Sequence, residues 1–388
     1  PQPGDLVLAF FVVAAFLLSP RAFLRVRMTW PVYGMGLFVA YTFVITCAWF
    51  FILNDPKNLS FPLFYAYNFA ILLTLYRLLS VEPAYWYRVL RWGLAAGVVV
   101  GFLMMIVNFD LSYARQSGGF NKPNQLAYFG LVSLCNLLLI HRRSPFSPLL
   151  LVLCAILSVV LVIASFSLTA IAALAFVLLA ILLTYWKDVR VVRGGAYVAC
   201  ALVVLGMTYD FGTARRYFAD QWDARVNRIG GKTENVAESR GYDRILNYPE
   251  YTIAGAAEGG FERFRDETGK HARIEIHSTF GTLLFSYGVI GLIMTLLILY
   301  LVLRQRGLAV KLIATAPLLY AVTHQGLRAT GFWLLLLLLI LEPGRSRAPR
   351  RAERPWPASR LHGGAGLTSE RVALSHADHG SQPTLPRY

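Results

Sequence analysis

The chain has 388 residues, of which 56% are hydrophobic and only 15% are charged. Soluble domains carry about 25% charged residues, so this composition excludes a water-soluble globule and predicts a membrane protein. The 37 Lys and Arg residues exceed the 21 Asp and Glu residues and give a formal net charge of +16. Because the charged residues lie between apolar runs, we expect this excess in loops beside a membrane and no nucleic-acid partner.

Eleven apolar runs are interpreted as membrane-spanning helices, because they have the composition and approach the length needed to cross about 30 Å of hydrocarbon. In chain order they cover residues 6–19, 30–53, 61–79, 92–109, 125–140, 149–164, 168–186, 195–211, 279–302, 309–322 and 329–342. Charged residues cost roughly 2.5 to 3.5 kcal/mol each at a helix centre, and here they lie at the ends of the runs or between them. The sequence therefore predicts an all-α polytopic membrane protein with about eleven transmembrane helices.

The short loops between these runs alternate in charge. Five of them hold fourteen Lys and Arg residues in total, whereas the short loops on the opposite side hold four. The five basic loops are residues 20–29, 77–91, 141–148, 187–194 and 303–311. By the positive-inside rule this basic set is expected in the cytoplasm, which puts residue 1 outside and the C-terminus inside.

The first apolar run is short and the sequence begins at Pro1 rather than at a methionine. A chain with both ends in the cytoplasm needs an even number of spans. We therefore expect twelve helices in the full chain, with one N-terminal helix missing from this sequence.

Two long polar segments complete the organisation. Segment 208–278 carries 11 basic and 12 acidic residues and is expected to be a large helical loop on the external side. Segment 343–388 has six prolines and eight arginines against three acidic residues, a composition that predicts a disordered basic tail in the cytoplasm. The transmembrane helices are thus expected in two groups, within residues 1–207 and 279–342.

The first part of the large loop has an amphipathic pattern. Phe218, Trp222, Val226 and Ile229 recur at helical spacing, which predicts a helix over residues 212–229. Such a helix either lies on the membrane surface or shapes a groove for an acceptor.

Polar residues just before the expected span 125–140 are the first candidates for substrate contact. Asn121, Lys122, Asn124 and Gln125 follow a Gly-Gly turn. Helix capping by asparagine explains much of this pattern, and contact with a sugar or a phosphate is the alternative.

A second set of candidates lies in the tight external turn before the span 168–186. Ser165 and Ser167 offer hydroxyl groups there. Such hydroxyls usually satisfy backbone groups freed by the turn, and contact with substrate is the alternative.

Two arginines in the large loop lie four residues apart. If Ser239 opens a helix, Arg240 and Arg244 share one of its faces and form a fork for a diphosphate. Guanidinium groups suit this role because they donate bidentate hydrogen bonds and keep their charge. The alternative is a solvated helix face with ion pairs to Glu238 and Asp243.

His277 lies just before the ninth expected span, where Ser278 or Thr279 is expected to cap the helix. A histidine with an ordinary pKa near 6.5 can accept a proton from a sugar hydroxyl at neutral pH, with Glu275 as the residue that orients it. A histidine that only anchors the helix end is the alternative.

The last external loop adds His324 and Arg328 as candidate substrate contacts, although Arg328 is alternatively an accident of topology. The four cysteines lie in apolar runs, and no Gly-rich nucleotide loop or metal-ligand pattern occurs. We therefore expect no metal ion and no cofactor.

Several of these motifs together resemble the O-antigen ligase and polymerase superfamily. The shared motifs are Asn-Lys-Pro-Asn-Gln-Leu at 121–126, Ser-x-Ser-x-Thr-Ala at 165–170, His277-Ser278-Thr279 and Tyr287-Gly288-x-x-Gly291. Members of this superfamily are twelve-span enzymes of the bacterial inner membrane that move glycan from undecaprenyl diphosphate to an acceptor at the periplasmic face, without a metal. The resemblance covers roughly residues 100–342 and implies that the large loop faces the periplasm.

The resemblance also implies roles for single residues. His277 matches the loop histidine that is proposed as the base, and Arg240 and Arg244 match arginines assigned to the diphosphate. Leu168 stands where the turn often has an arginine in the family. That diphosphate contact is therefore expected from Arg115 or Lys122.

The expected function is that of a metal-independent, inverting glycosyltransferase, with polymerase favoured. The nearly balanced charge of the large loop offers no strongly cationic surface for a phosphorylated lipid A core, and the Arg244-x10-Gly255 spacing resembles polymerase loops. A ligase that transfers glycan to lipid A core is the first alternative. A transporter or flippase for lipid-linked sugar is an alternative of another class, which the lack of charged residues at span centres disfavours.

Overall fold

The structure is a computed structural model of the whole chain, and it describes most of the expected helical core. The described residues are 27–54, 59–110, 115–186, 240–259, 261–264 and 275–342, with isolated positions at 10, 12–14, 17, 189, 193, 219–220, 222–223 and 227. The expected spans 6–19 and 195–211, the amphipathic helix 212–229 and the tail 343–388 lie outside the described residues except for those positions.

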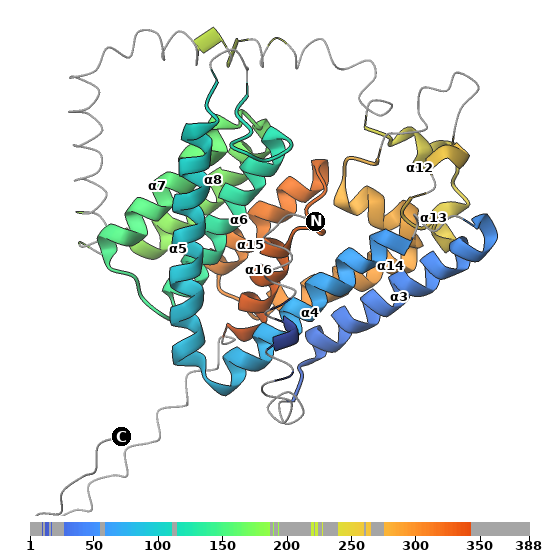
Figure 1. The fold of residues 1–388 in the computed structure, drawn as a ribbon, viewed down its shortest axis with the longest axis horizontal. Coiled ribbons are helices and arrows are strands. Elements are labelled where there is room, and N and C mark those ends of the chain that lie inside the picture. The colour runs from blue at the N-terminus through green and yellow to red at the C-terminus, as the bar shows by residue number, and fades with distance from the viewer. Residues whose placement is uncertain are drawn as a thin grey trace, which may run out of the picture. The chain divides into compact units, whose positions relative to one another are not determined.

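Nine long helices occur in this part of the chain, and no strand does (Figure 1). They are α3 (Trp30–Leu53), α4 (Ser60–Val81), α5 (Pro83–Val107), α6 (Pro123–His141), α7 (Pro148–Ala164), α8 (Leu168–Tyr185), α14 (Thr279–Leu303), α15 (Leu308–Thr323) and α16 (Thr330–Leu341). Six of them are long and apolar enough to cross a membrane, and α7, α15 and α16 are shorter apolar helices. The chain is therefore a helical membrane protein.

Helix α5 begins at Pro83 rather than at residue 92, so the sequence prediction placed this boundary wrongly. Proline suits the first turn of a helix because the amide hydrogen it lacks has no partner there. Arg91 was counted as a loop residue, but it lies on the helix with its Nη1 donating to the Pro145 carbonyl at 2.7 Å. Its guanidinium also lies 5.7 Å from the centre of the Phe146 ring. These contacts accommodate a charge within the helix, near its end.

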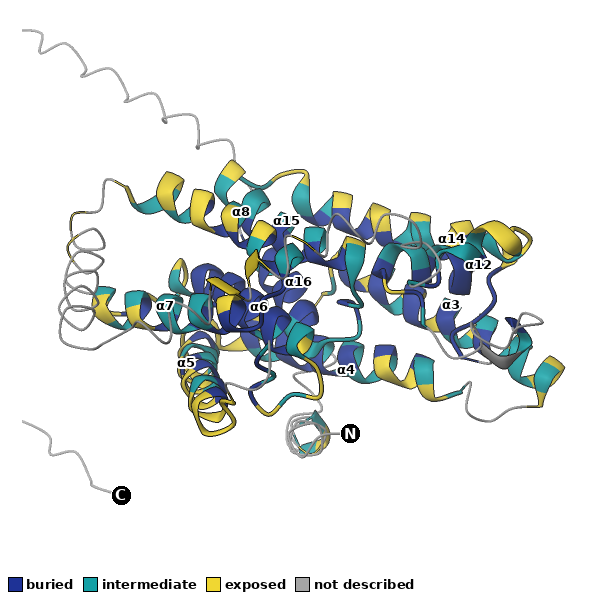
Figure 2. Cartoon of the chain, turned by 90° about the horizontal axis from the view of Figure 1, so that it is seen from above, coloured by how far each residue is buried: buried dark blue, intermediate teal, exposed yellow. Residues whose placement is uncertain are grey.

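Helix α6 is the centre of the packing. It contacts α5, α7, α8, α15 and α16, and it is coloured as buried along most of its length (Figure 2). Neighbouring helices rather than lipid therefore cover most of its surface. The position of its first turn, where Asn124 lies, is therefore fixed by neighbours on several sides.

Helix α14 is broken inside its apolar run. Gly288 has φ 67° and ψ −176°, which interrupts the helical hydrogen bonds. The carbonyl oxygens of Phe285 and Ser286 accept hydrogen bonds at 2.8 Å from the backbone amides of residues 256 and 257, and the Tyr287 carbonyl accepts from the Tyr41 hydroxyl at 2.9 Å. Broken helices persist in membranes where other groups satisfy the freed carbonyls, and here a loop segment supplies two of the donors.

Three short helices carry that loop segment. They are α12 (Asp243–Asn247), α13 (Tyr251–Ala254) and η2 (Phe261–Phe264), and α13 packs directly on α14. The approach is close because both backbones have glycine at the contact. A Cβ on Gly288 would lie 2.3 Å from the Ile253 carbonyl oxygen, and one on Gly255 would lie 2.7 Å from the Ser286 carbonyl oxygen.

The break in α14 leads to a first prediction. We expect Gly288→Ala to destabilise the protein by at least about 2 kcal/mol, because the new methyl group meets a carbonyl in a backbone conformation that alanine disfavours. The matched control is Gly97→Ala in α5, where a Cβ meets no atom within 4 Å. The measurement is the midpoint of thermal unfolding of both purified variants in detergent. Equal midpoints for the two variants would contradict the close approach.

Candidate functional site

The candidate site forms where one end of α6, one end of α14 and one end of α15 meet. The Tyr320 hydroxyl near the end of α15 donates to the Asn124 carbonyl in the first turn of α6 at 2.7 Å. The amide of Thr279, the first residue of α14, donates to the His324 carbonyl at 3.2 Å. Residues 196 positions apart in sequence are thus joined by a hydrogen bond.

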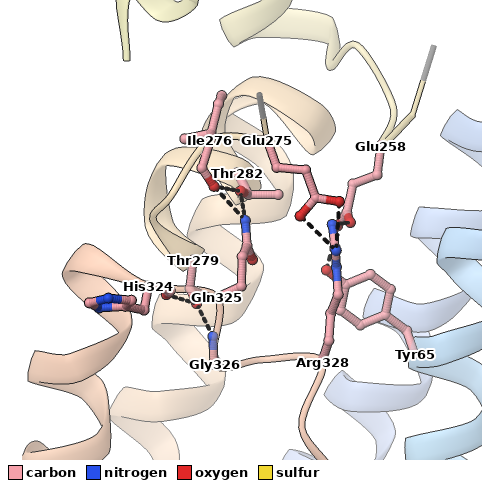
Figure 3. A network of polar contacts seen from close by, with 10 residues as sticks. All are labelled: Tyr65, Glu258, Glu275, Ile276, Thr279, Thr282, His324, Gln325, Gly326 and Arg328. Carbon is pink, nitrogen blue, oxygen red and sulfur yellow. Dashed lines mark hydrogen bonds and ion pairs between the residues drawn. The ribbon is translucent and has the colours of Figure 1, made fainter. Parts of the chain in front are cut away.

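Two loop segments, 275–279 and 324–328, lie against each other and form what we call the loop clamp (Figure 3). The Thr279 hydroxyl donates to the His324 carbonyl at 3.0 Å and accepts from the Gly326 amide at 2.8 Å. The Gln325 side chain donates to the Ile276 carbonyl at 2.7 Å. These contacts hold the residues on both sides of His277.

His277 itself is at the surface, and its backbone amide donates to the Arg240 carbonyl at 3.0 Å. Partial burial and the charges of Lys122 and Arg240 lower the pKa of its imidazole below the ordinary value of 6.5, whereas the charge of Glu275 acts in the opposite direction. The imidazole is therefore neutral at pH 7 and able to accept a proton. Ser278 caps α14 by accepting from the Gly281 amide at 3.1 Å, which confirms the expected cap.

His324 has a different environment, because hydrogen bonds occupy both of its ring nitrogens. Arg115 donates to the Asn124 side-chain oxygen, so the Asn124 amide group faces the other way and donates to His324 Nε2 at 2.8 Å. The proton of the ring then lies on Nδ1, which donates to the Thr323 hydroxyl at 2.8 Å. Burial and nearby cations lower the pKa of His324 to about 4. This histidine is a neutral structural group, and of the two only His277 presents its ring at the surface.

Three cations surround the two histidines. Arg115 donates through Nε to the Ser165 carbonyl at 2.8 Å, and Arg240 donates through Nη1 to the Thr323 carbonyl at 3.2 Å. Lys122 is exposed and lies close enough to lower the pKa of His277. The structure thus brings together candidates that come from three separate loops.

The prediction that Arg240 and Arg244 share one face of a helix is wrong. Gly241 adopts φ 71° between the two arginines, and α12 begins only at Asp243. Arg244 is 2% exposed, and its guanidinium lies 5.8 Å from the centre of the Phe264 ring. Arg240 instead lies in the turn beside His277. Burial lowers the pKa of Arg244 from its ordinary value.

Arg328 is held by carboxylates from two loop segments (Figure 3). It forms an ion pair with Glu258, which is 1% exposed, and a second ion pair at 3.2 Å with Glu275. Glu258 also accepts a hydrogen bond from the Tyr65 hydroxyl. Although burial opposes its charge, the two carboxylates raise the pKa of Arg328 above the ordinary value. Arg328 is therefore part of a buried ion network rather than an accident of topology.

Sequence reasoning missed Glu258 and Tyr65. The only sequence signal for Glu258 is a single carboxylate in a run of small residues, 255–260. Tyr65 lies within α4 and has the appearance of an ordinary apolar-run residue. With Arg244, Glu275 and Arg328, Glu258 lines a small cavity that residues of the loop clamp border.

The other candidate contacts divide into buried and exposed groups. Ser165 and Ser167 are buried, and the Ser165 hydroxyl donates to the Val162 carbonyl at 2.7 Å and accepts from the Ser167 amide at 3.2 Å. These serines therefore stabilise the turn that holds Arg115, as hydroxyls in turns usually do. Asn121 and Gln125 are exposed. The first residue before α6 is Lys122 and no side chain caps this helix, so capping by asparagine does not explain the motif.

Comparison of the sequence with family models and with curated proteins found no match. Within the described ranges, no group of three His, Cys, Asp or Glu side chains is arranged to hold a metal ion.

The buried ion network leads to a second prediction. We expect Glu258→Gln to lower stability by about 3–5 kcal/mol, because it leaves the Arg328 charge in a largely buried site without its main partner. Glu275→Gln is the matched control, since the Glu275 side chain is 36% exposed and such pairs contribute at most about 1 kcal/mol. Thermal unfolding in detergent at pH 7 measures both. A larger loss in Glu275→Gln than in Glu258→Gln would refute this assignment.

Proposed function

We propose that this chain is a glycosyltransferase of the bacterial inner membrane that moves an oligosaccharide from undecaprenyl diphosphate to a glycan acceptor at the periplasmic face. The observation that supports this most is the position of His277, an exposed imidazole whose pKa is lowered by partial burial and by the charges of Lys122 and Arg240, and whose backbone amide bonds the Arg240 carbonyl. A base beside fixed cations suits a reaction in which a hydroxyl loses a proton while a diphosphate leaves.

In the proposed reaction, the oxygen of an acceptor hydroxyl attacks the anomeric carbon of the donor sugar. The bond between that carbon and the diphosphate oxygen breaks, and the electron pair of the bond leaves with undecaprenyl diphosphate. His277 accepts the hydroxyl proton. Because attack and departure occur on opposite faces of the sugar in a single displacement, the anomeric configuration inverts.

Cations are proposed to stabilise the charge that develops on the leaving diphosphate. Arg115, Lys122 and Arg240 lie around the two histidines, and positive groups that are fixed where negative charge develops stabilise that charge. Arg244 is buried and lines the small cavity that Glu258 also lines. In this proposal Arg244 acts on the diphosphate at longer range than Arg115, Lys122 and Arg240 do.

An apolar hollow near the site suits the lipid part of a substrate. It has a volume of about 400 Å³ and lies between Trp222 of the large loop and the turn from α7 to α8 at Phe166. Ile163, Ile171 and Ala219 add to its apolar wall, and Asp223 also lines it. A lipid-linked acceptor, as a polymerase uses, is proposed to enter beneath the loop here. The favoured function is thus that of an O-antigen or exopolysaccharide polymerase, and transfer to lipid A core by a ligase is the alternative.

The proposed orientation of the chain, with the site on the periplasmic side of the inner membrane, leads to a third prediction. In a cysteine-free background, Asn121→Cys beside the site should react with an impermeant thiol reagent in cells with a permeabilised outer membrane. Gln305→Cys, after the end of α14, should react only after the inner membrane is opened. Both native side chains are exposed, so access to the reagent and not burial decides the result. Labelling of residue 305 in intact inner membranes would reverse the orientation.

The fourth prediction tests the activity directly. Purified protein in liposomes that contain an undecaprenyl-diphosphate-linked repeat unit should produce a ladder of longer lipid-linked glycans. His277→Gln should abolish the ladder, whereas His141→Gln, at the opposite end of α6, should retain it.

Because the pKa of His277 is lowered, wild-type activity should persist at pH 6.5 and fall only at more acidic pH. Transfer that appears only when lipid A core is added would establish the ligase instead. Equal activity of the His277→Gln variant would show that His277 is not the base.

A further inference from the structure

The loop clamp contains a charged residue, Arg328, that the proposed reaction does not use. Arg328 touches neither histidine ring in any contact that the structure describes, yet it bonds Glu275 through both carboxylate oxygens, at 3.2 and 3.3 Å. Glu275 lies two residues before His277 and on the same loop segment. Arg328 is therefore connected to the proposed base through one side chain.

The anchor of Arg328 is rigid. Its second carboxylate, Glu258, is buried and bonded to Tyr65 of α4, and its own carbonyl accepts from Asn68 of α4 at 3.0 Å. The guanidinium lies 4.9 Å from the centre of the Phe61 ring on the same helix. A guanidinium with carboxylates at both terminal nitrogens and an aromatic ring over one face has few alternative positions, so it restrains the carboxylates that it binds.

We propose that Arg328 is a positioning residue for His277, which holds the Glu275 carboxylate and thereby both fixes the loop that carries the histidine and keeps the nearest negative charge neutralised. This inference rests on the proposed function only in giving His277 a chemical task. In this proposal, the buried ion network of Glu258, Arg328 and Tyr65 holds the loop segment that carries His277 in place.

Charge is the reason that such an arrangement matters for a base. The charged or titratable groups that act on His277 are Lys122 at the start of α6, Arg240 before α12, His324 after α15 and Glu275 on its own segment. Glu275 is the one anion among them. A carboxylate without a partner would favour the protonated imidazole, which cannot accept a proton, whereas a carboxylate paired with a guanidinium does so less.

Two variants shift the titration of His277 in opposite directions under this proposal. Glu275→Gln removes the anion and leaves the Arg328–Glu258 pair intact, so it should lower the pKa of His277. Replacing both Glu258 and Arg328 by glutamine leaves Glu275 unpaired without burying an unpaired charge, so it should raise the pKa by about half a unit to one unit. Adding Glu275→Gln to the double variant should cancel the rise.

The measurement is NMR titration of isotope-labelled histidine in the full-length protein in nanodiscs. The signal of His277 is identified among the seven histidines by its loss in His277→Gln. Opposite shifts, cancelled in the triple variant, support the proposal. Shifts in the same direction, or no shift in folded protein, would overturn it.

The titration also separates this inference from the proposed function, because it requires no substrate. If the shifts occur and no glycan is transferred, the positioning role stands and the proposed reaction fails. If transfer occurs, the acidic limb of its pH profile should move with the measured pKa in each variant. A purely structural role for Arg328 would lower the amount of folded protein and leave that limb in place.

Discussion

The structure depends on one constraint, that backbone groups in a membrane must find their partners within the protein. The break at Gly288 frees carbonyl groups inside α14, and the segment after α13 and Tyr41 of α3 satisfy them. Part of the loop between the two helical groups is therefore joined to a membrane helix rather than laid upon it. This attachment brings Glu258 next to Arg328, and the rest of the site builds on that ion pair.

A related constraint acts on the buried charges. An unpaired charge in a dry interior is very unfavourable, and pairing with good geometry recovers most of that free energy. The pair of Glu258 and Arg328 holds the loop clamp in place, and the clamp presents His277 between cations. His324 adds rigidity because hydrogen bonds fix its tautomer. The ion pairs of Arg328 with Glu258 and Glu275 thus connect the broken helix α14 to the loop that carries His277.

The sequence located the helices because apolar length and charge placement reflect the membrane directly: the nine long helices described coincide with nine expected apolar runs, and six of them are long and apolar enough to cross a membrane. It also singled out His277 and His324. It failed where tertiary contacts decide, since the positive φ of Gly241 separates the arginines of the expected fork. It missed Glu258 because an irregular loop has no periodicity and its partner lies 70 residues away. Local patterns do not encode such pairings.

In the proposed reaction, His277 activates an acceptor hydroxyl for a single displacement at the donor sugar. The most direct test is the anomeric configuration of the newly formed linkage, determined by NMR on the product of a single transfer from a donor of known configuration. We expect the anomeric configuration to invert, because the hydroxyl attacks the anomeric carbon from the side opposite the diphosphate. Retention of the donor configuration would require a covalent glycosyl intermediate or attack from the same face, and would contradict the account.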